Sequence, residues 1–307
     1  MVYPWFFICK NLLQFVIKKI YIDYMPKVLA ADLDGTLMYP AHLFRCIPRK
    51  NVAFLRKWID AGNKLVLITS RGPEYMDRLR KEIQRDFDYV TYTSSYIVAN
   101  GEVIRDVSID AKTMIDITDR IYHEYHPVGY LMNTKDSPLL IKNVSGVGTL
   151  LICMYWFYWL FQGKRREKYI LSNKVFDEYL KNGNVYKVMV FFGLARSKNE
   201  IAKKLNKEFR NQYPEIESSW SHVVNEITPK NCNKGEGLKY YCDHLGINNE
   251  DVYVVGDSGN DISMFKLFYE NSFCMAKAYP SVKKHAKHVI SRVYHLDEIV
   301  NGKEKTK

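Results

Sequence analysis

Cysteine is scarce in this sequence, and no two cysteines stand close enough to form a paired ligand motif. The 307 residues contain six cysteines and no Cys-x-x-Cys pair. This pattern excludes a small disulfide-stapled scaffold and a zinc site. Scattered thiols are typical of reducing compartments, so we expect a cytoplasmic protein. The sequence also has no internal repeat and no low-complexity region, which excludes a repeat array.

An uninterrupted membrane-spanning run is also missing. Residues 1–24 form an N-terminal extension, and its apolar run 3–22 is broken by three lysines. Residues 149–161 are almost wholly apolar but too short to cross a bilayer. Either segment could contact a membrane surface. For 149–161, a buried element, a partner-binding patch and non-native sequence are further interpretations that stay open.

Acidic residues are fewer than basic ones, and the formal net charge is +11. The lysines and arginines are spread along the chain, and no dense basic cluster coincides with a nucleic-acid-binding motif. We therefore expect no nucleic-acid partner, and interpret the charge as a solvated surface that attracts anionic substrates. Hydrophobic residues make up 47% of the chain, enough for a sizeable core.

Two carboxylates follow the first apolar strand that the sequence predicts. Residues 28–31 are apolar without alternation, as in a strand buried on both faces of a parallel sheet. Asp32-Leu33-Asp34-Gly35-Thr36 comes next. If the strand continues through Asp34, both aspartates point to the same side. Such a pair needs a shared proton or a cation, and oxygen ligands favour Mg²⁺. The alternative is a strand that ends in a polar turn.

Two more segments place polar groups where phosphate binds well. The predicted strand 64–68 ends at Thr69, and Pro73 opens a helix. A hydroxyl there suits phosphate, although a simple helix cap explains it too. Lys234 follows the cap residue Asn233, and a lysine in the first turn of a helix opposes the helix dipole. A bound anion explains this lysine better than helix stability does, with a surface lysine as the alternative.

A second acidic pair follows the predicted strand 251–255. The segment Gly256-Asp257-Ser258-Gly259-Asn260-Asp261 places two carboxylates four residues apart after a strand tip. Glycines permit a tight loop there. The pair can hold a metal, or it can simply form a turn and a helix cap.

In combination and in this order, these segments resemble the motifs of the haloacid dehalogenase superfamily, Cof-type subfamily. Thr69-Ser70-Arg71 stands where Thr-Gly-Arg is common, and Lys277 stands where the family usually has asparagine. The resemblance implies an α/β fold, with a Rossmann-like core built on a parallel sheet and a large inserted α+β cap of the C2 type. The core would comprise 25–105 and 219–307, and the cap 106–218.

The resemblance also implies the chemistry, that of a Mg²⁺-dependent phosphoric monoester hydrolase acting on small phosphorylated metabolites such as sugar phosphates. Asp32 would be the nucleophile, forming an aspartyl-phosphate, and Asp34 the general acid and base. The metal would be bound by Asp32, Asp34, Asp257 and Asp261. The phosphate would be bound by Thr69, Lys234 and Asn260. The residues expected next to the substrate are Arg71 and Asn100.

Two other functions are compatible with the same motifs. A phosphomutase of the phosphomannomutase type would keep the core and a related cap. A membrane- or partner-binding protein that is not an enzyme could use 149–161 on a retained core.

Overall fold

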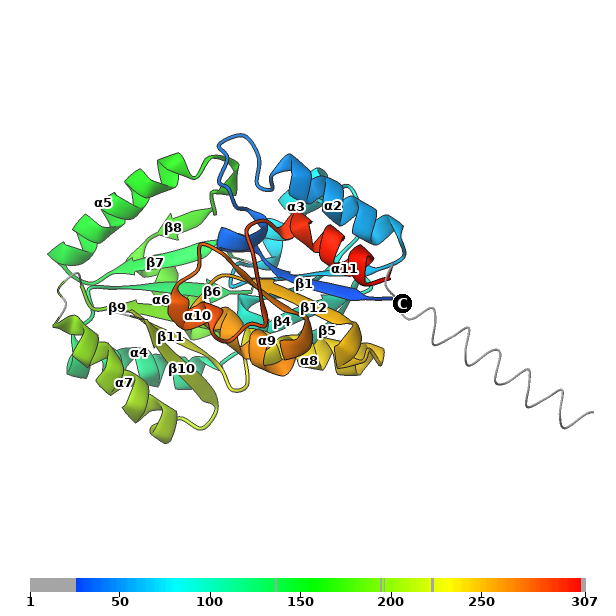
Figure 1. Cartoon of the computed structure of the whole chain (residues 1–307). Helices are drawn as coiled ribbons and strands as arrows, with labels where there is room; N and C mark the ends of the chain where they lie inside the picture. The colour runs from blue at the N-terminus through cyan, green and yellow to red at the C-terminus, as the bar shows by residue number, and fades with distance from the viewer. Residues whose placement is uncertain (1–25, 136, 194, 196, 222–223, 305–307) are drawn as a thin grey trace, which may run out of the picture.

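The computed structural model describes residues 26–304 except 136, 194, 196 and 222–223. The predicted extension 1–24 and its candidate membrane segment 3–22 lie outside the described residues. The described chain folds around two sheets, which lie side by side in Figure 1.

The larger sheet has eight strands in the order β14-β13-β12-β1-β2-β3-β4-β5. Neighbouring strands from β14 to β3 run parallel, and β4 and β5 are antiparallel additions. All of β1 is buried, as predicted for a strand covered on both faces. The strands are β1 Val28–Asp32, β2 Lys64–Ile68, β3 Asp88–Thr91, β4 Tyr96–Ala99, β5 Glu102–Asp106, β12 Val252–Gly256, β13 Ser272–Met275 and β14 His288–Ile290.

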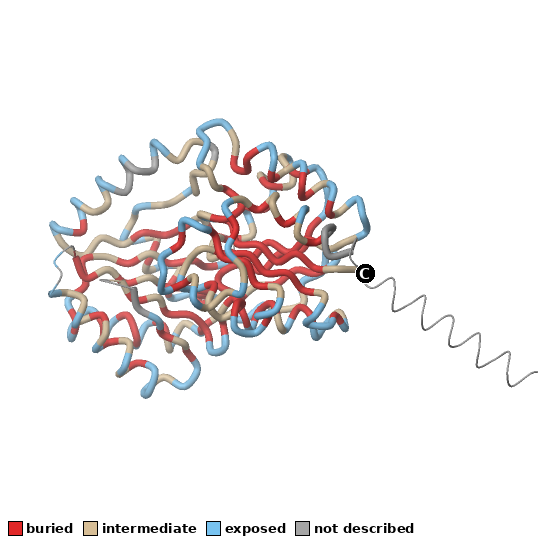
Figure 2. The backbone as a smooth tube through the Cα atoms, viewed as in Figure 1, coloured by how far each residue is buried: buried red, intermediate tan, exposed pale blue. Residues whose placement is uncertain are grey.

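Helices cover both faces of this sheet (Figure 1). One face packs against α2 (Arg49–Asp60), α3 (Met76–Ile83) and α11 (Leu296–Glu304). The other packs against α8 (Lys234–Leu245) and α9 (Ile262–Leu267), while α10 (Pro280–Lys283) precedes β14. The strands between these helices form the red, buried centre of Figure 2. This doubly covered parallel sheet confirms the predicted fold class, and it brings the carboxyl ends of its strands to one edge.

The smaller sheet has six strands in the order β10-β11-β9-β6-β7-β8. Its helices α4 (Ala111–Tyr125), α6 (Asn173–Asn182) and α7 (Lys198–Gln212) pack their apolar residues on one face of it. The strands are β6 Gly129–Thr134, β7 Leu139–Asn143, β8 Tyr169–Leu171, β9 Val185–Phe191, β10 Ile216–Ser221 and β11 Val224–Pro229. Helices on one face leave the other face available to a ligand or to the core.

The boundary predicted at residue 219 does not match the strand pairing. We expected the chain to return to the core there. Strands β10 and β11 instead pair with each other, and β11 pairs with β9 through Ile227 and Val188. The first helix after β11 that packs on the larger sheet is α8. The division into core and cap remains a prediction, and its second boundary belongs after Pro229.

The apolar segment 149–161 lies within one helix, α5 (Gly146–Phe161). Figure 1 shows α5 on the opposite side of the smaller sheet from α4 and α7. Several of its side chains are exposed, with Phe157 at 60% and Met154 at 53%, whereas Leu151 and Ile152 are partly buried. Among the side chains that the structure describes, α5 is therefore not a fully buried element. Among the described residues, no helix is both long and apolar enough to cross a membrane.

Candidate active site

Three polar residues meet at the carboxyl edge of the larger sheet. Asp32 ends β1 and is in register with Ile68, the last residue of β2. Thr69 follows Ile68 and begins the loop after β2. On the other side Ala31 is in register with Val255, which brings Asp257 next to Asp32. The sequence placed these residues at strand ends, and the sheet order makes them neighbours.

Strand β1 does not continue through Asp34, although the prediction that Asp32 and Asp34 point to the same side assumed that it does. β1 ends at Asp32, and residues 33–37 form a tight turn in which Gly35 has a φ of 81°. A Cβ at Gly35 would lie 2.2 Å from Oδ2 of Asp257, so only glycine fits there. The turn separates the two aspartates: Asp32 is buried, whereas the side chain of Asp34 is 52% exposed.

Lys234 lies between two buried carboxylates. Its Nζ is 2.6 Å from Oδ1 of Asp32 and 2.6 Å from Oδ1 of Asp261. Burial raises the pKa of Asp32 to about 8, against the opposing charge of Lys234. Burial alone would lower the pKa of Lys234, but the two carboxylates outweigh it and raise that pKa, so the ammonium keeps its proton. The ion pairs explain a lysine that helix stability does not, and exclude the surface-lysine alternative.

Both oxygens of Asp261 are engaged. While Oδ1 accepts from Lys234, Oδ2 accepts from the backbone N–H groups of Asp257 and Ser258, each at 2.9 Å. Ser258 completes a capping box with Asp261. The turn-and-cap interpretation therefore holds, and the same carboxylate also fixes the position of Lys234.

The acidic cluster suits a divalent cation. Carboxylate oxygens of Asp32, Asp257 and Asp261 lie within 4.8 Å of one another. Oδ2 of Asp32 is buried and has no hydrogen-bond partner among the described residues, a costly state that a cation would relieve. Hard oxygen donors are what Mg²⁺ prefers. The oxygens of Asp261 already accept three hydrogen bonds of 2.6 to 2.9 Å, whereas those of Asp257 have one ion pair and one hydrogen bond of 3.4 Å. Asp32 and Asp257 are therefore the better direct ligands.

Lys277, the departure from the family pattern, reaches this cluster. Its Nζ lies 2.9 Å from Oδ2 of Asp257 and 4.7 Å from the centre of the Tyr39 ring. The other oxygen of Asp257, Oδ1, accepts a 3.4 Å hydrogen bond from Thr36. An ammonium therefore stands beside a candidate metal ligand.

Asp34 is held by Arg71 and is not part of the acidic cluster. Two hydrogen bonds of 2.7 and 2.8 Å join the guanidinium to the carboxylate. Burial would raise the pKa of Asp34, but these bonds and the charge of Arg71 outweigh it and hold that pKa below its usual value. Arg71 also donates to the backbone oxygen of Arg165 at 3.0 Å and lies 3.6 Å from Glu167. Arg71 thus links the carboxyl edge of the larger sheet to the segment after α5.

Thr69 and Asn260 lie near the edge with their side chains already bonded locally. The buried hydroxyl of Thr69 accepts from the backbone N–H of Arg71 at 3.1 Å. The exposed Asn260 accepts from the hydroxyl of Ser258 at 2.7 Å. Neither contact tests the predicted role in phosphate binding.

Asn100 is not brought to the site. Its Oδ1 accepts from Lys64, and its backbone N–H donates to Asp88. Lys64 begins β2 and Asp88 begins β3, so Asn100 lies at the amino end of these strands, opposite Asp32. The prediction of a substrate neighbour is wrong here, because the Asn-Gly turn joins β4 to β5 at the far edge of the sheet.

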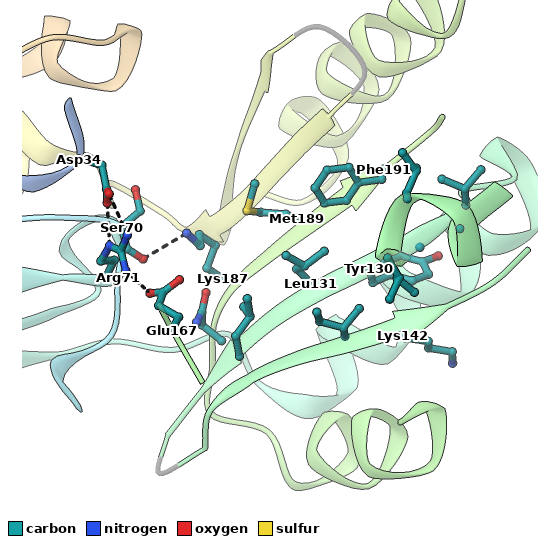
Figure 3. Close-up of a pocket in the computed structure, with 18 residues that line it drawn as sticks. Asp34, Ser70, Arg71, Tyr130, Leu131, Lys142, Glu167, Lys187, Met189 and Phe191 are labelled. Atoms are coloured by element: carbon teal, nitrogen blue, oxygen red, sulfur yellow. Dashed lines mark hydrogen bonds and ion pairs between the residues drawn. The ribbon is translucent and has the colours of Figure 1, made fainter. Parts of the chain in front are cut away.

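A cavity of about 400 Å³ opens between this edge and the smaller sheet. Figure 3 shows Asp34, Ser70 and Arg71 at one end, with Met189 and Phe191 farther along. Three charged lining residues were not predicted: Lys142, Glu167 and Lys187. The signal for Lys187 was present: it is the one charged residue in the strand 185–191. Its Nζ donates to the backbone oxygen of Ser70 at 3.2 Å.

Comparisons with known proteins agree with this architecture. A family model described as haloacid dehalogenase-like hydrolase matches residues 29–299. The 5-amino-6-(5-phospho-D-ribitylamino)uracil phosphatase YwtE of Bacillus subtilis is 25% identical over 308 residues, covering 90% of this chain and 99% of its own.

Solved structures show the same fold. A HAD/COF-like hydrolase from Plasmodium vivax superposes with a TM-score of 0.68 at 20% identity, covering 88% of this chain and 91% of its own. The phosphatase BT1666 of Bacteroides thetaiotaomicron gives a TM-score of 0.69 at 18% identity, covering 89% and 94%.

Proposed function

Because the chain belongs to the haloacid dehalogenase-like hydrolase family, we propose that it is a Mg²⁺-dependent phosphatase of small phosphorylated metabolites. The observation that carries this proposal is the state of Asp32. One of its oxygens is held 2.6 Å from the Lys234 ammonium, and the other is buried without a partner beside Asp257. A carboxylate held in this way is oriented, close to a cation and able to form a new bond.

In the proposed reaction Asp32 attacks the phosphorus of the ester and forms an acyl-phosphate. Asp34 gives a proton to the leaving oxygen as its bond to phosphorus breaks. Asp34 then takes a proton from a water molecule, which attacks the acyl-phosphate, releases inorganic phosphate and regenerates Asp32. Lys234 and Thr69 hold the phosphoryl oxygens, with Asn260 as a further contact.

The oxygen cluster of Asp32, Asp257 and Asp261 fits Mg²⁺. Asp32 and Asp257 would hold the ion, and the main-chain carbonyl of Asp34 would be a further ligand. When bound, this ion supplies positive charge that offsets the charge of the phosphoryl oxygens and of Asp32. The side chain of Asp34 stays free of the ion in this arrangement, which leaves it available for proton transfer.

The substrate is proposed as a small phosphorylated metabolite. The family resemblance favours sugar phosphates, and the name of the B. subtilis relative refers to a phosphorylated ribityl compound. Specificity would come from the cavity walls, since the catalytic residues contact only the phosphate and the leaving oxygen.

The test is release of inorganic phosphate from a panel of phosphorylated sugars and nucleotides, with Mg²⁺ or with EDTA. We expect release that requires Mg²⁺ and disappears in Asp32→Asn, while Asp34→Asn turns over far more slowly. Circular dichroism must show both variants folded. Substantial release by Asp32→Asn would refute the nucleophile assignment. Phosphate moved within a sugar, without release, would identify a phosphomutase instead.

A further inference from the structure

One wall of the cavity is the face of the smaller sheet opposite α4, α6 and α7. Side chains alternate along each strand. On β9, Val188 and Val190 pack against the helices, so Lys187, Met189 and Phe191 face the cavity. The neighbouring strand β6 presents Leu131 in register with Met189.

The polarity of this wall changes along the strands. Asn133 is in register with Lys187, and this pair lies at the end near Ser70. Leu131 and Met189 follow two residues farther, a step of about 7 Å for strand geometry. Phe191 lies another step beyond, as Figure 3 shows.

The other walls continue the same trend. Ile141 of β7 pairs with Leu131, and Leu151 and Ile152 of α5 line the cavity from the opposite side. The charged groups Asp34, Arg71 and Glu167 gather at the catalytic end (Figure 3). The one charged lining residue at the far end, Lys142, pairs with Asp177 at 2.5 Å.

We propose, on the basis of the function proposed above, that this cavity selects an amphiphilic phosphomonoester: a phosphate, a short polar connector, and then an apolar body. The connector lies beside Lys187 and Asn133. The apolar body packs between the sheet residues Leu131, Met189 and Phe191 and the α5 residues Leu151 and Ile152.

A sugar phosphate fits this wall less well. Its hydroxyls would reach the apolar stretch, where the described lining offers few polar partners, and buried hydroxyls without partners are costly. An apolar body gains free energy from the same contacts. The volume of about 400 Å³ is within the range of small-molecule sites.

The first measurement is phosphate release from a series of n-alkyl phosphates, ethyl to octyl, compared with glucose 6-phosphate. Once the alkyl chain extends past Lys187 and Asn133, kcat/KM should rise by up to about fourfold per methylene, the ratio that corresponds to about 0.8 kcal/mol for each buried CH₂. The longer alkyl phosphates should exceed glucose 6-phosphate. Equal kcat/KM values along the series would overturn the proposal.

The second measurement assigns the effect to the cavity. Met189→Gln places a polar group of similar size in the wall and should flatten the rise with chain length. Met154→Gln is the matched control, because Met154 lies on the exposed side of α5. If Met154→Gln flattens the rise and Met189→Gln does not, the chains bind outside the cavity and the proposal fails.

Direct binding separates this proposal from the proposed function. Dissociation constants for n-alkylphosphonates, which carry no ester bond, can be measured by calorimetry without turnover. Affinity that rises with chain length and depends on Met189 supports the cavity assignment even if no phosphate is released, and in that case the phosphatase proposal is what fails. Phosphate release with no length dependence in rate or affinity leaves the phosphatase standing and refutes the amphiphilic substrate.

Discussion

Replacing Lys234 with methionine removes the cation from the centre of the site while keeping a side chain of similar length. The Lys234 side chain is 1% exposed, and its Nζ lies 2.6 Å from both Asp32 and Asp261. Without it, two buried carboxylates face each other with oxygens no more than 4.8 Å apart. At an effective dielectric constant of about 20, two unit charges at that separation would repel by roughly 3 kcal/mol. Asp32, whose pKa burial already raises to about 8, would therefore take up a proton once Lys234 is gone.

The variant also loses both hydrogen bonds from Lys234 and leaves Asp261 without its cation. Breaking a buried ion pair from one side typically costs about 3–5 kcal/mol. We therefore expect Lys234→Met to lower the free energy of unfolding by about 3–5 kcal/mol in Mg²⁺-free buffer. The assay is urea unfolding followed by circular dichroism. Addition of Mg²⁺ should recover part of the loss, because a cation then returns to the carboxylates.

Lys239→Met is the matched control on the same helix. Lys239 pairs with Asp243 at 2.7 Å, but both side chains are about half exposed. Exposed pairs of this kind contribute little to stability, so the urea midpoint should barely move. If Lys234→Met unfolds too readily to measure, the double variant Lys234→Met/Asp261→Asn removes one of the two charges and should regain stability. Equal urea midpoints for the Lys234 and Lys239 variants would refute the ion-pair argument.

Three further predictions concern the N-cap of α4, the packing of the core and the binding of the metal. Asp110→Ala should destabilise the protein by about 1 kcal/mol near pH 7, because Asp110 caps α4 by accepting from the N–H of Thr113. That bond lowers the pKa of Asp110, so the difference is present above pH 3.8 and should vanish as the pH falls through the lowered pKa. Leu238→Ala should lower the free energy of unfolding in urea by about 2–5 kcal/mol, since Leu238 lies on α8 and is fully buried against the sheet. Mg²⁺ at one hundred times its dissociation constant should raise the free energy of unfolding by about 2.7 kcal/mol, and Asp257→Asn should remove most of that gain at the same concentration.

Much of the fold follows from local sequence signals. Residues 198–212 form the helix α7 because their apolar residues recur along one face. The cap residue Asn233 begins α8 as predicted, and Gly246 ends it in the left-handed conformation that favours glycine. These elements are specified by neighbours within a few residues.

The wrong predictions concern features that depend on pairing between strands far apart in the sequence. Strand β11 has the apolar pattern of a core strand, but its position depends on β9, which lies more than thirty residues earlier in the chain. The Asn100 turn was recognised as a turn, but which end of the sheet it occupies depends on strand direction. Local periodicity predicts that a strand exists and does not predict the sheet to which it belongs.

The site shows the same division. The strand-end aspartates and Lys234 were found by spacing and by the unfavourable position of a lysine at a helix start. The separation of Asp34 from Asp32 was missed, because it requires the turn at Gly35 and the partner Arg71 from the next strand end. Lys187 was missed because it becomes a lining residue only when the smaller sheet faces the larger one.

The contacts of Arg71 connect these two parts of the site. Arg71 binds Asp34 with two hydrogen bonds and also binds the Arg165 carbonyl, which comes from the segment after α5. In this state Asp34 is ionised, since its pKa is lowered, and an ionised carboxylate accepts a proton but has none to give. If Asp34 protonates the leaving oxygen as proposed, at least one of the two bonds from Arg71 must break first. The proton-donating state of Asp34 therefore depends on a residue that is also bound to the inserted segment, which ties the chemistry at the sheet edge to the position of the cavity wall.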